Sequence, residues 1–278
     1  MIFGLGYTGL ATALAVRQRG WTVGATTRGT AQELAGIVLS PFASVRLDGV
    51  THVLITAPPG EDGDPVLRAH LPAIRAARDL RWIGYMSTTG VYGDRGGGWV
   101  DEATPPAPSS ARGARRVQAE ADWASLGNRV AVDIMRLAGI YGPGRSAFDD
   151  LRAGTARRID KPGHAFGRIH RDDVAGAALV AMSQSPPAGV RVLNFNDDLP
   201  AESAEVIAEA ARLLGMPPPP LIRFADAAFS PMAASFWAEN RKVSSRRTQD
   251  TLGRRWAYPT YREGLEAILA TEGRDGLG

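Results

Sequence analysis

The chain has 278 residues, of which 44% are hydrophobic and 22% charged, enough for one large globular domain or a main domain with a small second one. The absence of cysteine excludes disulfides, thiolate metal ligands and cysteine nucleophiles, and we expect no metal site. Because no apolar run approaches the roughly 18 residues of a bilayer span and no secretory signal is visible, we expect a cytoplasmic protein that does not enter a membrane.

The net charge of +3 is modest, and the basic residues are spread along the chain rather than gathered into a tract. Adjacent arginines such as Arg115-Arg116 could bind phosphates, but a solvated surface is the simpler interpretation. We therefore expect a small-molecule substrate and no nucleic acid. The only lysines are Lys161 and Lys242. The sequence does not indicate the oligomeric state.

Short apolar runs alternate with helical patterns in the first half of the chain, which is typical of a parallel sheet with crossover helices. Strands are expected at 2–3, 21–26, 52–57, 82–87 and 130–137, and helices at 10–19 and 65–80. The pattern predicts an α/β fold, with a Rossmann-type doubly wound parallel sheet. The first strand is short, so either the chain starts inside it or this part of the sheet is weak.

A glycine-rich turn, Gly4-Leu5-Gly6-Tyr7-Thr8-Gly9, lies between the first strand and the first helix. Gly4 permits a tight turn, Gly6 lets a pyrophosphate approach the backbone, and Gly9 lets helix and strand pack closely. The helix N-terminus near Thr8 offers free N–H groups to phosphates. The turn therefore predicts a dinucleotide site, the alternative being a glycine-rich turn that binds nothing.

The end of the second strand, where an acidic residue would hold the 2′-hydroxyl of NAD, reads Thr26-Thr27-Arg28. Arg28 can pair with a 2′-phosphate and Thr27 can donate a hydrogen bond to it. This favours NADP over NAD as cofactor, although Arg28 could equally be solvated.

The segment 94–110 contains three consecutive glycines and three prolines, which indicates a surface loop placed to cover a crevice. Beyond Tyr141 the pattern changes. Helices are expected at 174–182, 201–214 and 264–270, and the four prolines at 217–220 are most simply a stiff connector.

Four motifs occur in the order found in one known family. They are the glycine-rich turn, Ser87-Thr88-Thr89-Gly90-Val91-Tyr92-Gly93, Arg136-Leu137-Ala138-Gly139-Ile140-Tyr141-Gly142-Pro143-Gly144, and Arg168-Ile169-His170-Arg171-Asp172-Asp173-Val174-Ala175. The chain thus resembles an extended short-chain dehydrogenase/reductase of the NAD(P)-dependent epimerase/dehydratase family. The resemblance is atypical, because Arg112 and Arg116 stand where the family has its Tyr-x-x-x-Lys pair. In the family that tyrosine trades a proton with the substrate, and arginine stays charged and cannot do so near neutral pH.

The resemblance implies roles for further residues. Thr88 would hold the substrate oxygen, with Ser87 beside it near the cofactor. The stretch Ala57-Pro58-Pro59 would pass beneath the adenosine ribose, and Leu137 and Ile140 would lie near the nicotinamide, although both stretches could simply be packed.

The resemblance also implies that residues 1–140, with 165–185 returning to them, form a dinucleotide-binding domain. Residues 141–164 and 186–278 would form a small subdomain that selects the substrate. Four arginines beyond Tyr141 would favour an anionic substrate such as a nucleotide-sugar, unless they are solvated; these are Arg145, Arg152, Arg157 and Arg168.

The motif lacks its usual proton donor. Tyr141 is a candidate because it leaves a strand at the carboxyl end, where α/β sheets bind ligands. We expect Tyr92 to be packed, His170 to be structural, and Asp173 to cap the helix that begins at Val174. Two functions remain open: an oxidoreductase or epimerase with a rearranged proton donor, and a non-catalytic protein that senses NADP(H).

Overall fold

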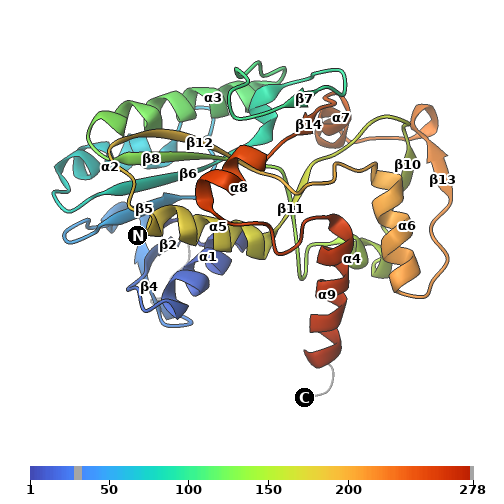
Figure 1. The fold of residues 1–278 in the computed structure, drawn as a ribbon, viewed down its shortest axis with the longest axis horizontal. Helices are drawn as coiled ribbons and strands as arrows, with labels where there is room; N and C mark the ends of the chain where they lie inside the picture. Colours follow the sequence, from blue (N-terminus) through green and yellow to red (C-terminus); the bar gives the residue numbers. More distant parts are fainter. Residues whose placement is uncertain (28–32, 276–278) are drawn as a thin grey trace.

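The computed structural model describes residues 1–27 and 33–275. Its centre is an eight-stranded sheet in the order β12-β8-β6-β5-β1-β2-β4-β3, with every neighbouring pair parallel except β3 and β4 (Figure 1). The strands are β1 (Ile2–Phe3), β2 (Gly24–Thr27), β3 (Glu33–Leu34), β4 (Ile37–Pro41), β5 (His52–Ile55), β6 (Trp82–Thr88), β8 (Ala131–Leu137) and β12 (Gly189–Phe195). The predicted α/β class with a doubly wound sheet is confirmed.

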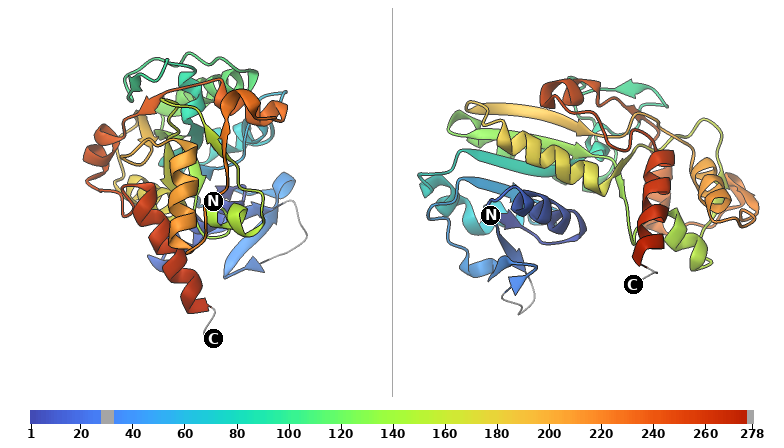
Figure 2. Two further views of the ribbon diagram at one scale, coloured as in Figure 1. Left: turned by 90° about the vertical axis from the view of Figure 1, so that its right-hand side faces the viewer. Right: turned by 60° about the horizontal axis from the view of Figure 1, so that its bottom comes forward.

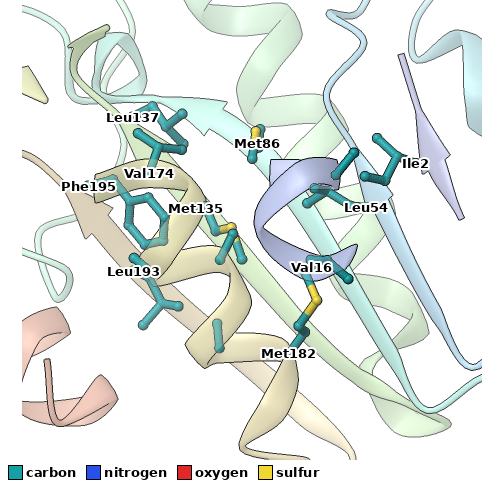
Figure 3. Packing of buried hydrophobic residues seen from close by; sticks show 14 of the residues in the cluster. Ile2, Val16, Leu54, Met86, Met135, Leu137, Val174, Met182, Leu193 and Phe195 are labelled. Carbon is teal, nitrogen blue, oxygen red and sulfur yellow. The ribbon is translucent and has the colours of Figure 1, made fainter. Parts of the chain in front are cut away.

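Helices cover both faces of this sheet (Figures 1 and 2). One face packs against α1 (Tyr7–Gln18) and α5 (Arg171–Ser183), and the other packs against α2 (Pro65–Ala76) and α3 (Ala111–Ala124). In Figure 3, Val16 of α1 and Met182 of α5 lie on the strand residues of the first face. Burial of apolar surface on both faces explains why the inner strands are nearly continuous hydrophobic runs.

The strand order reverses between β1 and β5. From β1 the sheet runs through β2 toward one edge and through β5 and β6 toward the other. In open α/β sheets a ligand crevice forms at such a reversal, outside the carboxyl ends of the strands. The glycine-rich turn follows β1 and therefore lies at this crevice.

A third hydrophobic cluster, which includes Phe148, Tyr261 and Leu265, joins β9 (Gly139–Tyr141), α4 (Ala147–Arg152), α6 (Ser203–Leu213) and α9 (Tyr261–Asp275). The helices α4, α6 and α9 lie to one side of the main sheet in Figure 1. The other elements beyond β9 are β10 (Arg158–Asp160), β11 (Arg168–His170), β13 (Leu221–Arg223), α7 (Pro231–Trp237), β14 (Lys242–Val243) and α8 (Arg246–Leu252). The exact division into two domains stays a prediction.

Several element bounds differ from those expected. The strand expected at 21–26 begins only at Gly24, and α2 ends at Ala76 because the backbone of Ala77 is extended. The segment 94–110 is not only a loop, since it contains β7 (Trp99–Val100), which pairs in parallel with β14. Short 3-10 helices occur at η1 (Phe42–Ser44), η2 (Thr89–Tyr92), η3 (Ser125–Asn128) and η4 (Phe224–Asp226).

Asp173 does not cap α5, contrary to expectation. The cap is His170, whose Nδ1 accepts a hydrogen bond from the Asp172 N–H at 3.2 Å. Asp173 is buried within the first turn, and its carboxylate accepts from the N–H groups of Ala257 and Tyr258. Because these partners lie more than 80 residues away, local sequence could not indicate them. Among residues 1–27 and 33–275, no helix is long and apolar enough to cross a bilayer.

Candidate active site

The glycine-rich turn has the backbone that a dinucleotide site requires. Gly4 has a φ of +99°, which favours glycine, and a Cβ on Gly9 would lie 2.3 Å from the carbonyl oxygen of Gly4. A Cβ on Gly6, by contrast, would have no heavy atom of the described residues within 4 Å. Gly4 and Gly9 thus serve the turn and its packing, whereas the space above Gly6 is open to a ligand.

Two threonines from neighbouring strands hold this turn in place. Thr26, at the end of β2, accepts a hydrogen bond from the Gly4 N–H at 2.9 Å. Thr56, just after β5, donates to the carbonyl oxygen of Gly4 at 2.5 Å. The sequence placed Thr56 only in the stretch expected beneath the adenosine ribose and did not indicate either hydrogen bond, because Gly4 lies 22 and 52 residues away from the two threonines.

The helix that follows the turn begins at Tyr7, and its N-cap Gly6 has no side chain to fill the free N–H groups. This end is therefore suited to an anion such as a pyrophosphate. The hydroxyl of Tyr7 donates to the carbonyl oxygen of Pro143 at 3.0 Å, and the guanidinium groups of Arg145 and Arg171 lie over its ring. Tyr7 therefore links the turn to the segment after β9.

The other predicted cofactor residues surround the same crevice. Ala57 and Pro59 are half-buried and Pro58 is exposed, directly after β5. Thr27 ends β2, and Arg28 lies outside the described residues. Leu137 is buried in the first hydrophobic cluster and Ile140 packs against that cluster. Both residues therefore have the packing role that was the alternative to contact with the nicotinamide. Their contact with a cofactor stays a prediction.

Thr88 ends β6 beside Leu137 of β8 and is half-buried. Its Oγ1 accepts a hydrogen bond from the Gly90 N–H at 3.1 Å and thereby caps η2. The structure shows no acceptor for its hydroxyl hydrogen within 1–27 or 33–275. Thr88 can therefore donate to a substrate oxygen, as the resemblance implies.

The hydroxyl of Ser87, unlike that of Thr88, has an acceptor for its hydrogen. Its hydroxyl donates to Glu120 of α3 at 2.6 Å, and Glu120 forms a buried ion pair with Arg136 of β8 at 2.7 Å. The guanidinium of Arg136 lies over the ring of Tyr92, which is fully buried and donates to the carbonyl oxygen of Asp101 and to Asn194. The prediction that Tyr92 is packed is confirmed, and the network fixes the end of β6 against α3.

Arg116 and Arg112 lie one turn apart on α3, as the motif requires, but their guanidinium groups have different surroundings. Arg116 is buried and donates to the carbonyl oxygen of Met86 at 2.7 Å and to the Tyr85 hydroxyl at 3.2 Å. Burial raises the pKa of Tyr85 to about 12. Arg112 is exposed and lies over the ring of Phe236 in α7. A group that can exchange a proton near neutral pH is present at neither position.

Among the described residues, no contact brings Tyr141 beside Thr88. It ends β9, which pairs with β11 rather than with the main sheet. Its hydroxyl points to α9, where it lies 3.4 Å from the carbonyl oxygen of Thr260 and against Gly264. Burial raises the pKa of its hydroxyl far above the ordinary value. The geometry gives its predicted catalytic role no support.

His170 has the structural role that was expected. Besides capping α5, its ring packs against the rings of Tyr141 and Tyr258. Burial lowers its pKa from the ordinary 6.5 to about 4, so the ring is neutral near neutral pH.

The four arginines proposed to attract an anionic substrate do not converge. Arg145 and Arg168 line a cavity of about 410 Å³ between β9, α4, α6 and α9. Two aspartates of α4 line the same cavity and balance their charge. Arg152 forms an ion pair with Glu272, and Arg157 donates to the carbonyl oxygen of Ala228.

Comparison with known proteins places this site in a family. Protein YeeZ of Escherichia coli (strain K12) is 30% identical over 249 residues, which cover 78% of this chain and 84% of that protein. A putative NAD-dependent epimerase/dehydratase from Methylobacillus flagellatus is 26% identical, with a TM-score of 0.75 over 98% of this chain and 97% of that chain. The chain is an atypical member of the NAD-dependent epimerase/dehydratase family.

Further proteins are similar to this chain in sequence or in fold. A functionally unknown conserved protein from Silicibacter pomeroyi DSS is 45% identical, with a TM-score of 0.88 and 98% of both chains covered. The 3-diazoavenalumate denitrifying reductase of a Streptomyces species is 29% identical over 215 residues, 71% of this chain and 68% of that protein. Human epimerase family protein SDR39U1 (isoform 2), solved with NADPH, shares the fold at 21% identity, with a TM-score of 0.78 over 96% and 99% of the two chains. No family model matches the chain.

Proposed function

We propose that the chain binds a nicotinamide adenine dinucleotide in the crevice at the β1–β5 reversal and acts as an oxidoreductase or epimerase on a small polar substrate. The observation that carries this proposal is the open space above Gly6, in a turn whose other glycines are closely packed. The names of two relatives, an epimerase/dehydratase and a reductase, support the same reaction class.

The pyrophosphate would lie over Gly6 at the N-terminus of α1, and the adenosine part near Ala57 and Pro59. We propose NADP rather than NAD, because the sequence has Thr27 and Arg28 and no carboxylate at the end of β2. A carboxylate there would repel a 2′-phosphate, which a threonine hydroxyl and a guanidinium can both bind.

The bound nicotinamide would supply or accept a hydride. Thr88 would hold the substrate oxygen through its free hydroxyl hydrogen, and the Ser87–Glu120–Arg136 network keeps the end of β6 in position. Arg116 would add positive charge near the ribose, but neither it nor Arg112 can deliver a proton. Turnover should therefore be slower than in relatives that keep the tyrosine.

A second function, a dinucleotide-binding sensor without turnover, is favoured by the placement of the two arginines. Arg116 is bound to the backbone of β6, and Arg112 leans over Phe236 of α7, so α7 could report the state of the crevice. Absence of turnover with intact cofactor binding would favour this sensor.

Calorimetric titration with NADPH and NADH tests the proposal in three proteins. Gly6→Val should remain folded by circular dichroism, because the position is open, yet lose binding of both dinucleotides. Gly9→Ala should instead disturb the fold, since its Cβ would meet the Gly4 carbonyl. If folded Gly6→Val binds NADPH as the wild type does, the dinucleotide site is not at this turn.

A further inference from the structure

The end of β6 is approached by an arginine from a distant part of the chain. Arg241 lies between α7 and β14, and its Nη1 donates to the carbonyl oxygen of Gly93 at 2.9 Å. The same nitrogen forms an ion pair with Glu239 at 2.6 Å. The Arg241 side chain is only 16% exposed, so a largely buried guanidinium, to which the sequence assigned no catalytic role, lies near the end of β6.

The side chains of Arg241 and Thr88 both lie close to the position that a Cβ on Gly90 would occupy. A Cβ built on Gly90 would lie 3.4 Å from Oγ1 of Thr88 and 3.9 Å from Nη2 of Arg241. Within the described part of the chain, neither Nη2 nor the hydroxyl hydrogen of Thr88 has an acceptor. Two hydrogen-bond donors without acceptors that flank one point form a place for an oxygen atom with negative charge.

The Arg241 guanidinium is held in one orientation. Glu239, 11% exposed, fixes its Nη1, and Ser109 donates to the other carboxylate oxygen of Glu239. Ser109 directly precedes Ser110, the N-cap of α3, so the ion pair is joined to the helix that carries Arg112. Donors that are fixed before the reaction stabilise developing charge without a cost of reorganisation.

We propose that Arg241 is a catalytic residue that, together with Thr88, binds the oxygen of a carbonyl substrate; this rests on the proposed function. A reduced nicotinamide dinucleotide would give a hydride to the carbonyl carbon, forming a C–H bond. The π bond of the carbonyl would break, and its electron pair would stay on the oxygen. Arg241 and Thr88 would stabilise this oxyanion, and water would then supply the proton that arginine cannot give.

The first experiment measures the affinity of the site for an oxyanion in the absence of turnover. We would titrate carbon-13 acetate, a small oxyanion, into the wild type and its variants by NMR, with and without saturating NADP. Arg241→Met should weaken acetate binding at least tenfold, whereas Arg241→Lys should retain part of it. Glu239→Gln should tighten binding, because it removes a negative charge beside the site. A merely structural ion pair would predict no tightening.

The matched control is Arg95→Met. Arg95 also ties the segment before α3, by donating to the carbonyl oxygens of Tyr92 and Pro105, and in the described part of the chain it makes no hydrogen bond to Gly90 or Thr88. Its acetate affinity should equal that of the wild type. Equal losses in Arg95→Met and Arg241→Met, or no loss in either, would overturn the proposal.

The second experiment measures reduction of 9,10-phenanthrenequinone with NADPH. Arg241→Met should lower kcat/KM by about 10²–10³, the usual effect of losing one oxyanion donor, and leave the NADPH Kd unchanged. An unchanged kcat/KM would overturn the catalytic role. If the wild type binds acetate through Arg241 but binds neither NADPH nor NADH, the proposed function is wrong and the catalytic role with it, while the anion site stands.

Discussion

The two ends of the crevice differ in how far they keep the features of the family. At the phosphate end, Gly4, Gly6 and Gly9 all have the backbone surroundings that a dinucleotide turn needs. At the chemical end, around Thr88, the frame of β6 and α3 is kept but the tyrosine and lysine are arginines. Binding and proton transfer therefore depend on separate residues, and one can be kept while the other changes.

The scaffold beneath the chemical end is held by buried polar contacts. Ser87, Glu120 and Arg136 form a buried network, and the Arg116 guanidinium has become part of the packing against β6. Each charge of this ion pair would be costly to bury alone, so the pairing holds α3 and β8 in one arrangement. The two arginines therefore stand on an ordered scaffold.

Restoring the family pair should have the largest effect. Arg112→Tyr combined with Arg116→Lys should raise NADPH-dependent reduction of 9,10-phenanthrenequinone by about 10²–10⁴, the usual contribution of a positioned general acid. Steady-state kinetics at pH 7 would measure it, and Arg112→Phe with Arg116→Lys is the control without a hydroxyl.

The opposite pattern of turnover rates would contradict the statement that the chemical end lacks a proton donor. If the unchanged protein turns over rapidly, and Tyr141→Phe abolishes turnover while Arg112→Ala does not, then the proton donor has moved to Tyr141.

Breaking the buried network should have the next largest effect. Arg136→Met leaves the Glu120 carboxylate buried without its partner, and should lower the free energy of unfolding by about 3–5 kcal/mol in urea denaturation. Arg46→Met removes one partner of an ion pair whose side chains are 86% and 77% exposed, and should change it by less than about 1 kcal/mol. Similar losses in both variants would show that the network is not a rigid scaffold.

The cap of α5 at His170 should make the stability of the protein sensitive to acid. Burial lowers the pKa of His170 from 6.5 to about 4, so between these values the unfolded chain binds a proton that the folded chain does not. The contribution of the neutral His170 ring to the free energy of unfolding is therefore complete above pH 6.5 and is lost as the pH falls toward 4.

His170→Asn keeps a capping side chain without a titrating ring. Its free energy of unfolding should fall less than that of the wild type between pH 7 and pH 4, by roughly 2 kcal/mol. Equal slopes in urea melts across this range would show that His170 does not carry the effect.

The smallest predicted effect is on cofactor choice at the phosphate end. Arg28→Asp should weaken NADPH binding about tenfold or more by calorimetry and change NADH binding little, because it replaces a charge-assisted contact to the 2′-phosphate with repulsion. Arg19→Asp makes the same charge change at the exposed far end of α1 and should leave both affinities unaltered. Equal or tighter binding of NADH by the wild type would contradict the NADP preference.

The sequence predicted those parts that depend on local pattern. The strands β5, β6 and β8, the helix α1 and the glycine-rich turn follow from apolar runs, helical spacing and glycine spacing within a few residues. The packed Tyr92 and the structural His170 were predicted from their motifs. Their atomic partners, such as Asn194 for Tyr92, became visible only in the structure.

What could not be predicted depends on contacts between distant segments. Arg241 lies 148 residues from Gly93, whose carbonyl it binds, and no local spacing indicates that contact. Asp173 was expected to cap its own helix, but its carboxylate binds the backbone near Tyr258 instead. Tyr141 was expected to leave the carboxyl end of a sheet strand, but it is the last residue of β9, which pairs with β11 outside the main sheet, so its hydroxyl faces α9.

The central claim is that the phosphate end binds a dinucleotide and directs it toward Thr88. A crystal structure of the protein with NADP tests it most directly. We expect the pyrophosphate over Gly6 at the N-terminus of α1, and the nicotinamide C4 facing the side of the crevice that holds Thr88 and Arg241. A dinucleotide bound elsewhere, or a pyrophosphate away from Gly6 with the turn unchanged, would contradict the account.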